Sequence, residues 1–340
     1  MSVRISKLII VFICSISTLT VSAQSSSSIA TITAADLESH VTFLASPLLM
    51  GRKNGEKGLE IAAEYIAAQA KLIGLKPANG NSYFQSYTIT NSEKVETMTL
   101  RNVAGYIEGS DPKLKNEVVV YSAHYDHIGG YGDRIYVGAD DNASGCAALL
   151  EMAQAFQSLK TKPRRTILFL WVSGEEIGLY GSAAYVNSPL FPLENTVVNL
   201  NMDMIGRTKG VADTTLHNPM SEQNTVFLIT GNQSSDLQSI VNQVEKRVAL
   251  DFDYSLSGTN HPLRLLFRSD QYNFIRNDIP VLFFSTGLHV DYHTPRDVIE
   301  LLDFNKMETI TRTMYKIGFE VANRETRIVV DNPYSRWRSR

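Results

Sequence analysis

Histidines and acidic residues follow several apolar runs of this sequence, close to the point where each run ends. Most of them follow the runs 118–123, 167–173, 198–202 and 281–285, and one lies in a loop between two such runs; they are His124, Asp126, Asp141, Glu175, Glu176, Asp203 and His293. In open α/β sheets the carboxyl ends of the strands deliver side chains into one crevice. Carboxylates gathered there would repel one another unless a cation neutralised them. The spacing therefore predicts a metal site.

The residue types indicate which metal such a site would hold. Tetrahedral zinc accepts histidine nitrogen and carboxylate oxygen and can keep one position open for water. A bridging carboxylate can hold two ions together. Calcium prefers sites made of oxygen alone, whereas cobalt and manganese accept ligands similar to those of zinc. The ligand set favours zinc over calcium.

Strand-like and helical segments alternate along the chain that carries these residues. Apolar, β-branched runs predict strands at 103–107, 117–123, 166–172, 197–202, 226–230 and 280–285. Helical periodicity recurs at 34–45, 56–73, 143–159, 176–187, 236–248 and 304–321. Continuous apolar strands that alternate with helices predict an α/β fold. The expected architecture is a three-layer α/β/α sandwich with a central mixed, mostly parallel sheet.

The sequence indicates one folded domain after a short leader. Residues 24–340 contain no internal repeat and no linker that would divide them, and we expect a single domain. Within it, 207–268 is less regular and is expected as an excursion from the edge of the sheet, near the active site. The hydrophobic content of 44% is enough for one large core.

Residues 1–23 have the pattern of a secretory signal peptide. Arg4 and Lys7 precede the apolar run 8–19, and Val21-Ser22-Ala23 provides a small-x-small exit. The run is shorter than the roughly 20 apolar residues that a membrane span needs. A lipid anchor on Cys14 is the competing interpretation, but it would cut the apolar run in its middle. We expect an exported protein, periplasmic or secreted, without a membrane span.

The charge and the cysteine content argue against a nucleic-acid partner and an internal disulfide. Without residues 1–23 the chain has 30 basic and 35 acidic residues, since the 32 basic residues include Arg4 and Lys7, and the net charge becomes −5. A nucleic-acid partner would require a basic patch or stripe, so none is expected. Cys146 is then the only cysteine, and an internal disulfide is not possible. The oligomeric state remains open at this point.

Five motifs in order along the chain resemble those of the M28 metallopeptidases. They are His124-Tyr-Asp126, Gly138-Ala-Asp140-Asp141-Asn142-Ala-Ser144-Gly145, Gly174-Glu175-Glu176, Asn201-Met-Asp203 and His293-Thr-Pro-Arg-Asp297. The resemblance implies a zinc-dependent aminopeptidase that hydrolyses N-terminal residues from peptides with a free N-terminus. It also implies two zinc ions and a non-proline cis peptide between Asp141 and Asn142.

The resemblance further implies a role for each matched residue. Asp141 would bridge the two ions, with His124 and Asp203 on one and Glu176 and His293 on the other. Asp126 would accept the spare N–H of His124 and fix its tautomer. Glu175 would act as general base, taking a proton from the zinc-activated water and passing it to the leaving amine.

Other polar residues have a plainer interpretation. His289 competes with His293 for the last ligand place, but only His293 precedes Thr-Pro. Asp270 is expected to cap the helix that follows, although family members place an acidic residue here near the substrate pocket, and many follow it with histidine where this chain has Gln271. We expect solvated loops for three other histidines and simple packing for Cys146; the histidines are His127, His217 and His261.

Three other functions compete with aminopeptidase action. Glutaminyl cyclases are transferases on the same fold, but they tend to depart from the pattern that residues 141–145 keep. A non-catalytic ectodomain would have lost ligands, and this chain has lost none. Carboxypeptidase or other amidohydrolase action is a further alternative. The side chain preferred in the first pocket cannot be predicted from the sequence.

Overall fold

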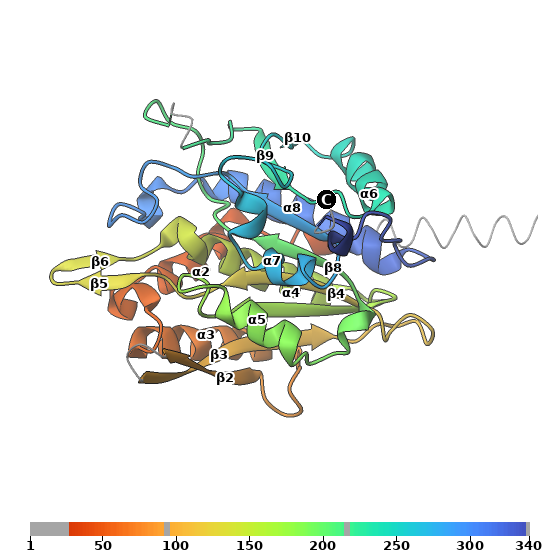
Figure 1. Cartoon of the computed structure of the whole chain (residues 1–340), viewed down its shortest axis with the longest axis horizontal. Helices are drawn as coiled ribbons and strands as arrows, with labels where there is room; N and C mark the ends of the chain where they lie inside the picture. The colour runs from red at the N-terminus through yellow and green to blue at the C-terminus, as the bar shows by residue number, and fades with distance from the viewer. Residues whose placement is uncertain (1–26, 92–95, 214–217, 338–340) are drawn as a thin grey trace, which may run out of the picture.

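The computed structural model describes residues 27–91, 96–213 and 218–337 (Figure 1). The expected signal peptide and His217 lie outside these ranges. No helix within the described ranges is long and apolar enough to cross a membrane.

A mixed sheet forms the centre of the described residues (Figure 1). Its order is β1-β3-β7-β4-β8-β11-β9-β10, and β2 pairs with β3. The four central strands, β7, β4, β8 and β11, are parallel, whereas β3 and β9 run antiparallel to them. The strands are β1 Lys76–Pro77, β2 Phe84–Asn91, β3 Glu96–Ile107, β4 Val118–His124, β7 Thr166–Val172, β8 Thr196–Met202, β9 Thr225–Ile229, β10 Asp251–Asp253 and β11 Val281–Ser285.

Helices cover both faces of the sheet, which confirms the predicted three-layer sandwich. On one face lie α2 Ala34–Leu44, α3 Lys57–Ile73, α4 Gly145–Ser158, α6 Ser235–Glu245 and α8 Phe304–Asn323. On the other lie α5 Tyr180–Asn187 and α7 Gln271–Ile275. Successive β4 residues alternate between the two cores: Val119 and Tyr121 pack with the first group, Val118 and Val120 with the second. This alternation explains why the central strands are continuously apolar.

Helix α5 begins later than the sequence indicates. The expected helix starts at Glu176, but Gly178 and Leu179 have φ values of 128° and 60°, which an α-helix cannot accommodate. The N–H groups of both residues donate to the carbonyl of Glu175, closing a turn instead. Glu175 and Glu176 therefore lie on a loop after β7 rather than on a helix.

The range 207–268 contributes to the sheet as well as to the loops around it. It supplies β9, α6 and β10, and β9 pairs antiparallel with β11. A separate hairpin of β5 Gly129–Tyr131 and β6 Arg134–Tyr136 projects beyond the sheet (Figure 1, yellow).

Candidate metal centre

The metal-ligand candidates gather where the central parallel strands end. His124 is the last residue of β4, and Asp203 directly follows β8. The turn with Glu175 and Glu176 follows β7, and His293 lies in the loop after β11. Because these four strands are parallel neighbours, their carboxyl ends share one edge of the sheet.

The two carboxylate oxygens of Asp141 lie close to two different groups of residues. Its Oδ1 lies 3.2 Å from Nε2 of His124, which is also 3.3 Å from Oδ1 of Asp203. Its Oδ2 lies 3.1 Å from Nε2 of His293, and that nitrogen is 3.1 Å from Oε2 of Glu176. The five expected ligands thus form two groups that share Asp141.

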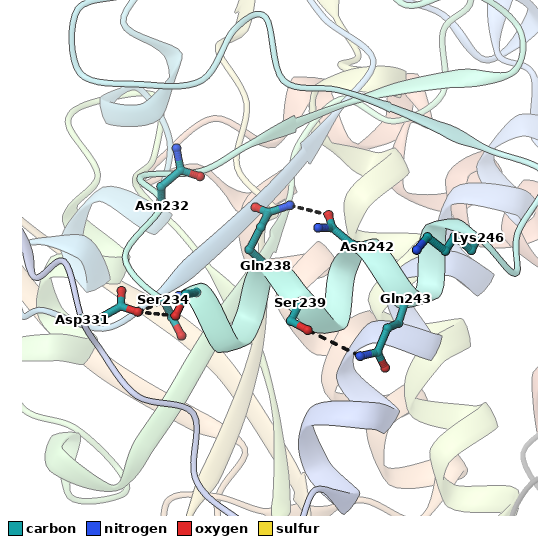
Figure 2. Close-up of a pocket in the computed structure, with 9 residues that line it drawn as sticks. Asn232, Ser234, Gln238, Ser239, Asn242, Gln243, Lys246 and Asp331 are labelled. Atoms are coloured by element: carbon teal, nitrogen blue, oxygen red, sulfur yellow. Dashed lines mark hydrogen bonds between the residues drawn. The ribbon is translucent and has the colours of Figure 1, made fainter.

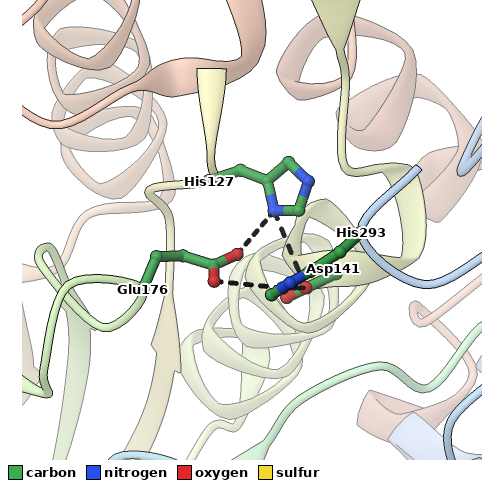
Figure 3. A group of neighbouring side chains, drawn as sticks. All are labelled: His127, Asp141, Glu176 and His293. Carbon is green, nitrogen blue, oxygen red and sulfur yellow. Dashed lines mark hydrogen bonds and ion pairs between the residues drawn. The ribbon is translucent and has the colours of Figure 1, made fainter. Parts of the chain in front are cut away.

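His127 joins the second group (Figure 3). Its Nδ1 lies 2.7 Å from Oε1 of Glu176 and 3.6 Å from Oδ2 of Asp141. The residue is 1% exposed, so its predicted place in a solvated loop is wrong. The ring turns inward because the segment beside it, at Arg52 and Lys53, pairs with the His127 backbone. That pairing is a tertiary contact, which the sequence does not reveal.

The geometry of these donors fits zinc. Bonds of ~2.0–2.1 Å in a tetrahedron separate neighbouring ligand atoms by roughly 3.3 Å, and most of the separations here lie between 3.1 and 3.6 Å. Nε2 of His293 is equally far from two carboxylate oxygens, yet it has no hydrogen-bond partner among the described residues. Histidine and carboxylate donors that surround one point at these separations suit a cation.

The electrostatics of the cluster also favour a cation. Burial raises the pKa of Glu175 well above its ordinary value, and Asp203 adds to this effect while His124 opposes it. Burial lowers the pKa of His293, but Asp141 and Glu176 outweigh it and raise that pKa to about 10. Positive charge is therefore stabilised here and additional negative charge is not.

Asp126 meets its expected partner His124 through its backbone carbonyl rather than through its carboxylate. Its Oδ1 is 3.8 Å from Nδ1 of His124, which lies 3.1 Å from the Asp126 backbone carbonyl instead. The carboxylate accepts hydrogen bonds from Asn54 Nδ2 at 2.6 Å and from the backbone N–H groups of Glu175 and Glu176 at 3.2 and 3.3 Å. Asp126 therefore holds the turn that presents both glutamates, rather than orienting the imidazole through its carboxylate.

The loop that carries Asp141 is fixed from both sides. The peptide between Asp141 and Asn142 is cis, as expected. Asp297 accepts the backbone N–H groups of Asp140 and Asp141 at 2.9 and 3.0 Å. Asn142 donates to the carbonyl of Met202 at 3.0 Å, and its own side-chain oxygen accepts the N–H of residue 204 at 3.3 Å. Asn142 thus ties the loop of Asp141 to the segment on either side of Asp203.

Arg52 supports the centre and was not identified from the sequence. Its buried guanidinium donates to the carbonyls of Tyr125, Val137 and Gly138 at 2.8, 2.6 and 2.9 Å. These carbonyls belong to the chain between His124 and Asp141. No signal in the sequence pointed to this role, because an arginine in a loop is usually exposed.

The loop after β11 selects His293 over His289. The ring of Tyr292 stacks on that of His293, with centroids 3.8 Å apart and an interplanar angle of 25°. Asp291 fixes the same loop through Arg207, whose Nη2 lies 2.9 Å from its Oδ2. Nε2 of His289 instead lies 3.5 Å from Oδ2 of Asp140, outside both groups.

Comparison with known proteins assigns this arrangement to a family. Residues 102–318, which include all five motifs, match the sequence profile of peptidase family M28. The chain belongs to this family. Aminopeptidase YwaD of Bacillus subtilis is 26% identical over 261 residues, covering 75% of this chain and 52% of that protein. Leucine aminopeptidase 1 of Arthroderma otae is 31% identical over 218 residues, covering 61% and 55%. The chain thus spans about half the length of these relatives.

Solved structures share the fold of this M28 chain. The LapA aminopeptidase of Legionella pneumophila superposes with a TM-score of 0.68 at 20% identity, covering 89% of this chain and 75% of that one. BSAP, a zinc aminopeptidase from Bacillus subtilis, gives 0.67 at 17%, covering 88% and 98%. A glutaminyl cyclase of Bacteroides thetaiotaomicron gives 0.63 at 15%, covering 87% and 99%. Identities this low show a common fold only.

A cavity adjoins the metal-ligand candidates of this M28 chain. Glu175, Asp141 and Asp203 line its acidic side. The rest of its wall is mostly apolar and is formed by Met204, Leu265, Arg268, Ser269, Phe283, Ser285, Leu288 and Tyr292. A second groove runs along α6 (Figure 2); there amide side chains bond to one another, such as Gln238 to Asn242 at 2.8 Å. Of the cavity and the groove, only the cavity beside the metal-ligand candidates combines acidic residues with an apolar wall.

Asp270 is buried near the cluster instead of capping α7 with its side chain. Neither of its carboxylate oxygens has a hydrogen-bond partner among the described residues. Burial, with Asp126 and Asp203 adding to it and His124 opposing it, raises the pKa of Asp270 to about 7. Gln271 fills a structural role, accepting from Asn201 and donating to two backbone carbonyls.

Proposed function

We propose that this M28 peptidase is a zinc-dependent aminopeptidase that binds two ions and uses Glu175 as general base. The observation that carries the proposal is the division of the Asp141 oxygens between two histidine and carboxylate groups beside a cavity. The relatives named as aminopeptidases support it. His124, Asp141 and Asp203 would hold one ion, and Asp141, Glu176 and His293 the other.

The chain's own residues suit the steps of peptide hydrolysis. Zinc, when bound, supplies Lewis-acid chemistry that polarises a carbonyl and acidifies a water. Glu175 lines the cavity on the side of Asp203, where its carboxylate can take a proton from the attacking water and give it to the leaving amine. Asp126 fixes the backbone of Glu175 and keeps this base in place.

The cavity also supports a preference for a free N-terminus. Its acidic side attracts the ammonium group of a peptide, and acetylation removes that charge. The apolar wall made by Met204, Leu265, Phe283 and Leu288 suits an apolar first side chain. The proposed substrates are peptides with an apolar N-terminal residue.

The N-terminal sequence pattern supports export of this enzyme. Arg4, Lys7 and the apolar run after them lead to a small-x-small exit before Gln24. We propose that the chain is cleaved there and acts in the periplasm or outside the cell.

Amino-acid release tests the proposal directly. The protein from residue 24 onward should release the first residue from peptides with free N-termini, and not from acetylated ones. A chelator should abolish release and zinc should restore it. Glu175→Gln should lower kcat at least ~100-fold while zinc content stays unchanged, because the base is lost and the ligands remain.

Two outcomes would contradict this function. Release from acetylated peptides would exclude an enzyme that requires a free N-terminus. No release from any peptide by folded, zinc-loaded protein would exclude a peptidase. Cyclisation of N-terminal glutamine without hydrolysis would then favour the glutaminyl cyclase alternative.

A further inference from the structure

The two groups of metal-ligand candidates differ in the number of donors. The first contains His124, Asp141 and Asp203, and the second contains His127, Asp141, Glu176 and His293. Zinc takes four ligands in a tetrahedral site; structural sites fill all four from the protein, and catalytic sites leave one position for water or substrate. The three-donor group has the composition of an open site, and the four-donor group that of a closed one.

His127 is oriented toward the four-donor group and held there. Its ring meets that of His293 nearly at right angles, with centroids 5.7 Å apart (Figure 3). Its backbone N–H donates to the carbonyl of Arg52 at 3.2 Å, and the buried guanidinium of Arg52 is itself fixed by several carbonyls. The Nδ1 atom of His127 therefore faces Glu176 and Asp141 without a rotation of the loop.

Packing alone does not account for an imidazole in this position. Nε2 of His127 is buried and has no hydrogen-bond partner among the described residues. Leaving such a group unpaired costs about 1–3 kcal/mol, and one hydrogen bond from Nδ1 to Glu176 does not satisfy the other nitrogen. A metal ion on Nδ1 would not pair Nε2, but Nδ1 is the nitrogen that faces Glu176 and Asp141, and a bond from it to a metal would offset the cost of burying the ring.

We propose that His127 is a zinc ligand that completes the four-donor position, so that this position binds its ion more tightly and the other keeps the open coordination place. The proposal rests on the zinc dependence proposed above. It places the exchangeable ion with His124 and Asp203, on the side where Glu175 and Asp203 line the cavity. The two ions would then have different roles, because four protein donors retain one while the other stays accessible to substrate.

Zinc titration tests the proposal without an activity assay. Chelator-treated protein would be titrated with zinc against a chromophoric chelator, and the bound metal counted by mass spectrometry. The wild type should bind two ions, the first at least ~10-fold more tightly than the second. His127→Ala should weaken the tight ion by at least ~10-fold, whereas His124→Ala should weaken the other.

His127→Asn separates metal ligation from a purely structural role. An asparagine amide can donate to Glu176 much as Nδ1–H does, but it lacks the imidazole lone pair that zinc prefers. A ligand role predicts that Asn loses as much affinity as Ala. Retention of wild-type affinity by His127→Asn would overturn the proposal, and so would equal affinities for the two ions in the wild type.

The result of the zinc titration can be distinguished from the result of the peptide-release assay. Two unequal zinc sites in a protein that hydrolyses no peptide would overturn the aminopeptidase and leave the role of His127 supported. An active aminopeptidase in which His127→Asn binds both ions with wild-type affinity would support the aminopeptidase and overturn the role of His127. Circular dichroism and urea unfolding of each chelator-treated variant would establish that it folds, and His127→Asn carries the test if His127→Ala does not.

Discussion

At the scale of single residues, the carboxylates around the metal centre affect one another through charge. Asp270 is buried, lacks a hydrogen-bond partner among the described residues, and contributes to the raised pKa of Glu175. Its negative charge disfavours the ionised form of Glu175, which is the form that a general base requires. Asp270 thus influences the proposed base without a contact to substrate being needed.

Asp270→Asn should therefore move the acidic limb of the pH–activity profile. Asp270 is ionised above its pKa of about 7, and removing that charge lowers the pKa of Glu175, so the base ionises at lower pH and kcat/KM is retained to lower pH. The measurement is kcat/KM as a function of pH for both proteins, with Asp251→Asn as control, because Asp251 is exposed at the start of β10. An unchanged limb, or a shift to higher pH, would contradict this account.

The site residues show what could be predicted from sequence and what could not. His124, Glu175, Asp203 and His293 were identifiable because each follows an apolar run, and parallel strands end at one edge. His127 was missed because its orientation depends on a pairing with residues 52 and 53, far away in sequence. The accepting atom of Asp126 was predicted wrongly for a similar reason: whether its carboxylate or its carbonyl lies closest to His124 depends on the turn after β7.

At the scale of elements, the turn Pro47–Arg52 joins several loops into one support. Gly51 has a φ of 68°, and a Cβ on it would lie 2.3 Å from the carbonyl oxygen of Tyr136, so the turn can approach the β5–β6 hairpin only with glycine there. The adjacent Arg52 then reaches the carbonyls between β4 and Asp141. The chain before β4 thereby positions the loops that follow it.

Arg52→Met should destabilise the protein strongly. It keeps an unbranched apolar stem but leaves several buried carbonyls without a donor, each at about 1–3 kcal/mol, so a loss of at least ~3 kcal/mol is expected. Urea unfolding of chelator-treated protein measures it. The matched control is Arg164→Met, which removes a more exposed ion pair with Asp111 and should cost at most ~1 kcal/mol. Equal losses in the two variants would refute the supporting role.

The sequence predicted the bounds of an element correctly where every residue of that element is buried. The strand 166–172 was predicted with its observed bounds because all seven of its residues are buried and apolar or β-branched. β2 and the β5–β6 hairpin were not predicted, since they are more exposed and lack a continuous apolar run. The start of α5 was missed because Gly178 and Leu179 adopt left-handed conformations that helical periodicity does not detect.

At the scale of the whole molecule, part of the buried acidic cluster opposes folding unless a cation binds. Burial raises the pKa of Asp126 and of Glu175, so their ionised forms are less stable at this edge of the sheet than in a hydrated, unfolded chain, whereas the histidines around Asp141 and Glu176 outweigh burial and lower the pKa of those two carboxylates. Zinc binding to the folded state alone should therefore stabilise the protein by mass action.

Zinc should raise the midpoint of thermal unfolding of chelator-treated protein. At a free concentration 100 times the Kd, each ion contributes about 2.7 kcal/mol. The measurement is calorimetry with and without zinc, and His293→Ala should show a smaller increase because one position loses a ligand. A midpoint that does not respond to zinc would mean that the cluster binds no ion in the folded protein.

The distribution of the ligands over the chain has a kinetic consequence. The donors lie on β4, the loop before α4, the turn after β7, the end of β8 and the loop after β11, and no two of the central strands are joined by a short hairpin. Pairing of the four central strands must therefore precede high-affinity metal uptake. In a refolding experiment, zinc capture from a fluorescent indicator should follow the pairing of these strands, and its rate then reports when the centre of the sheet is assembled.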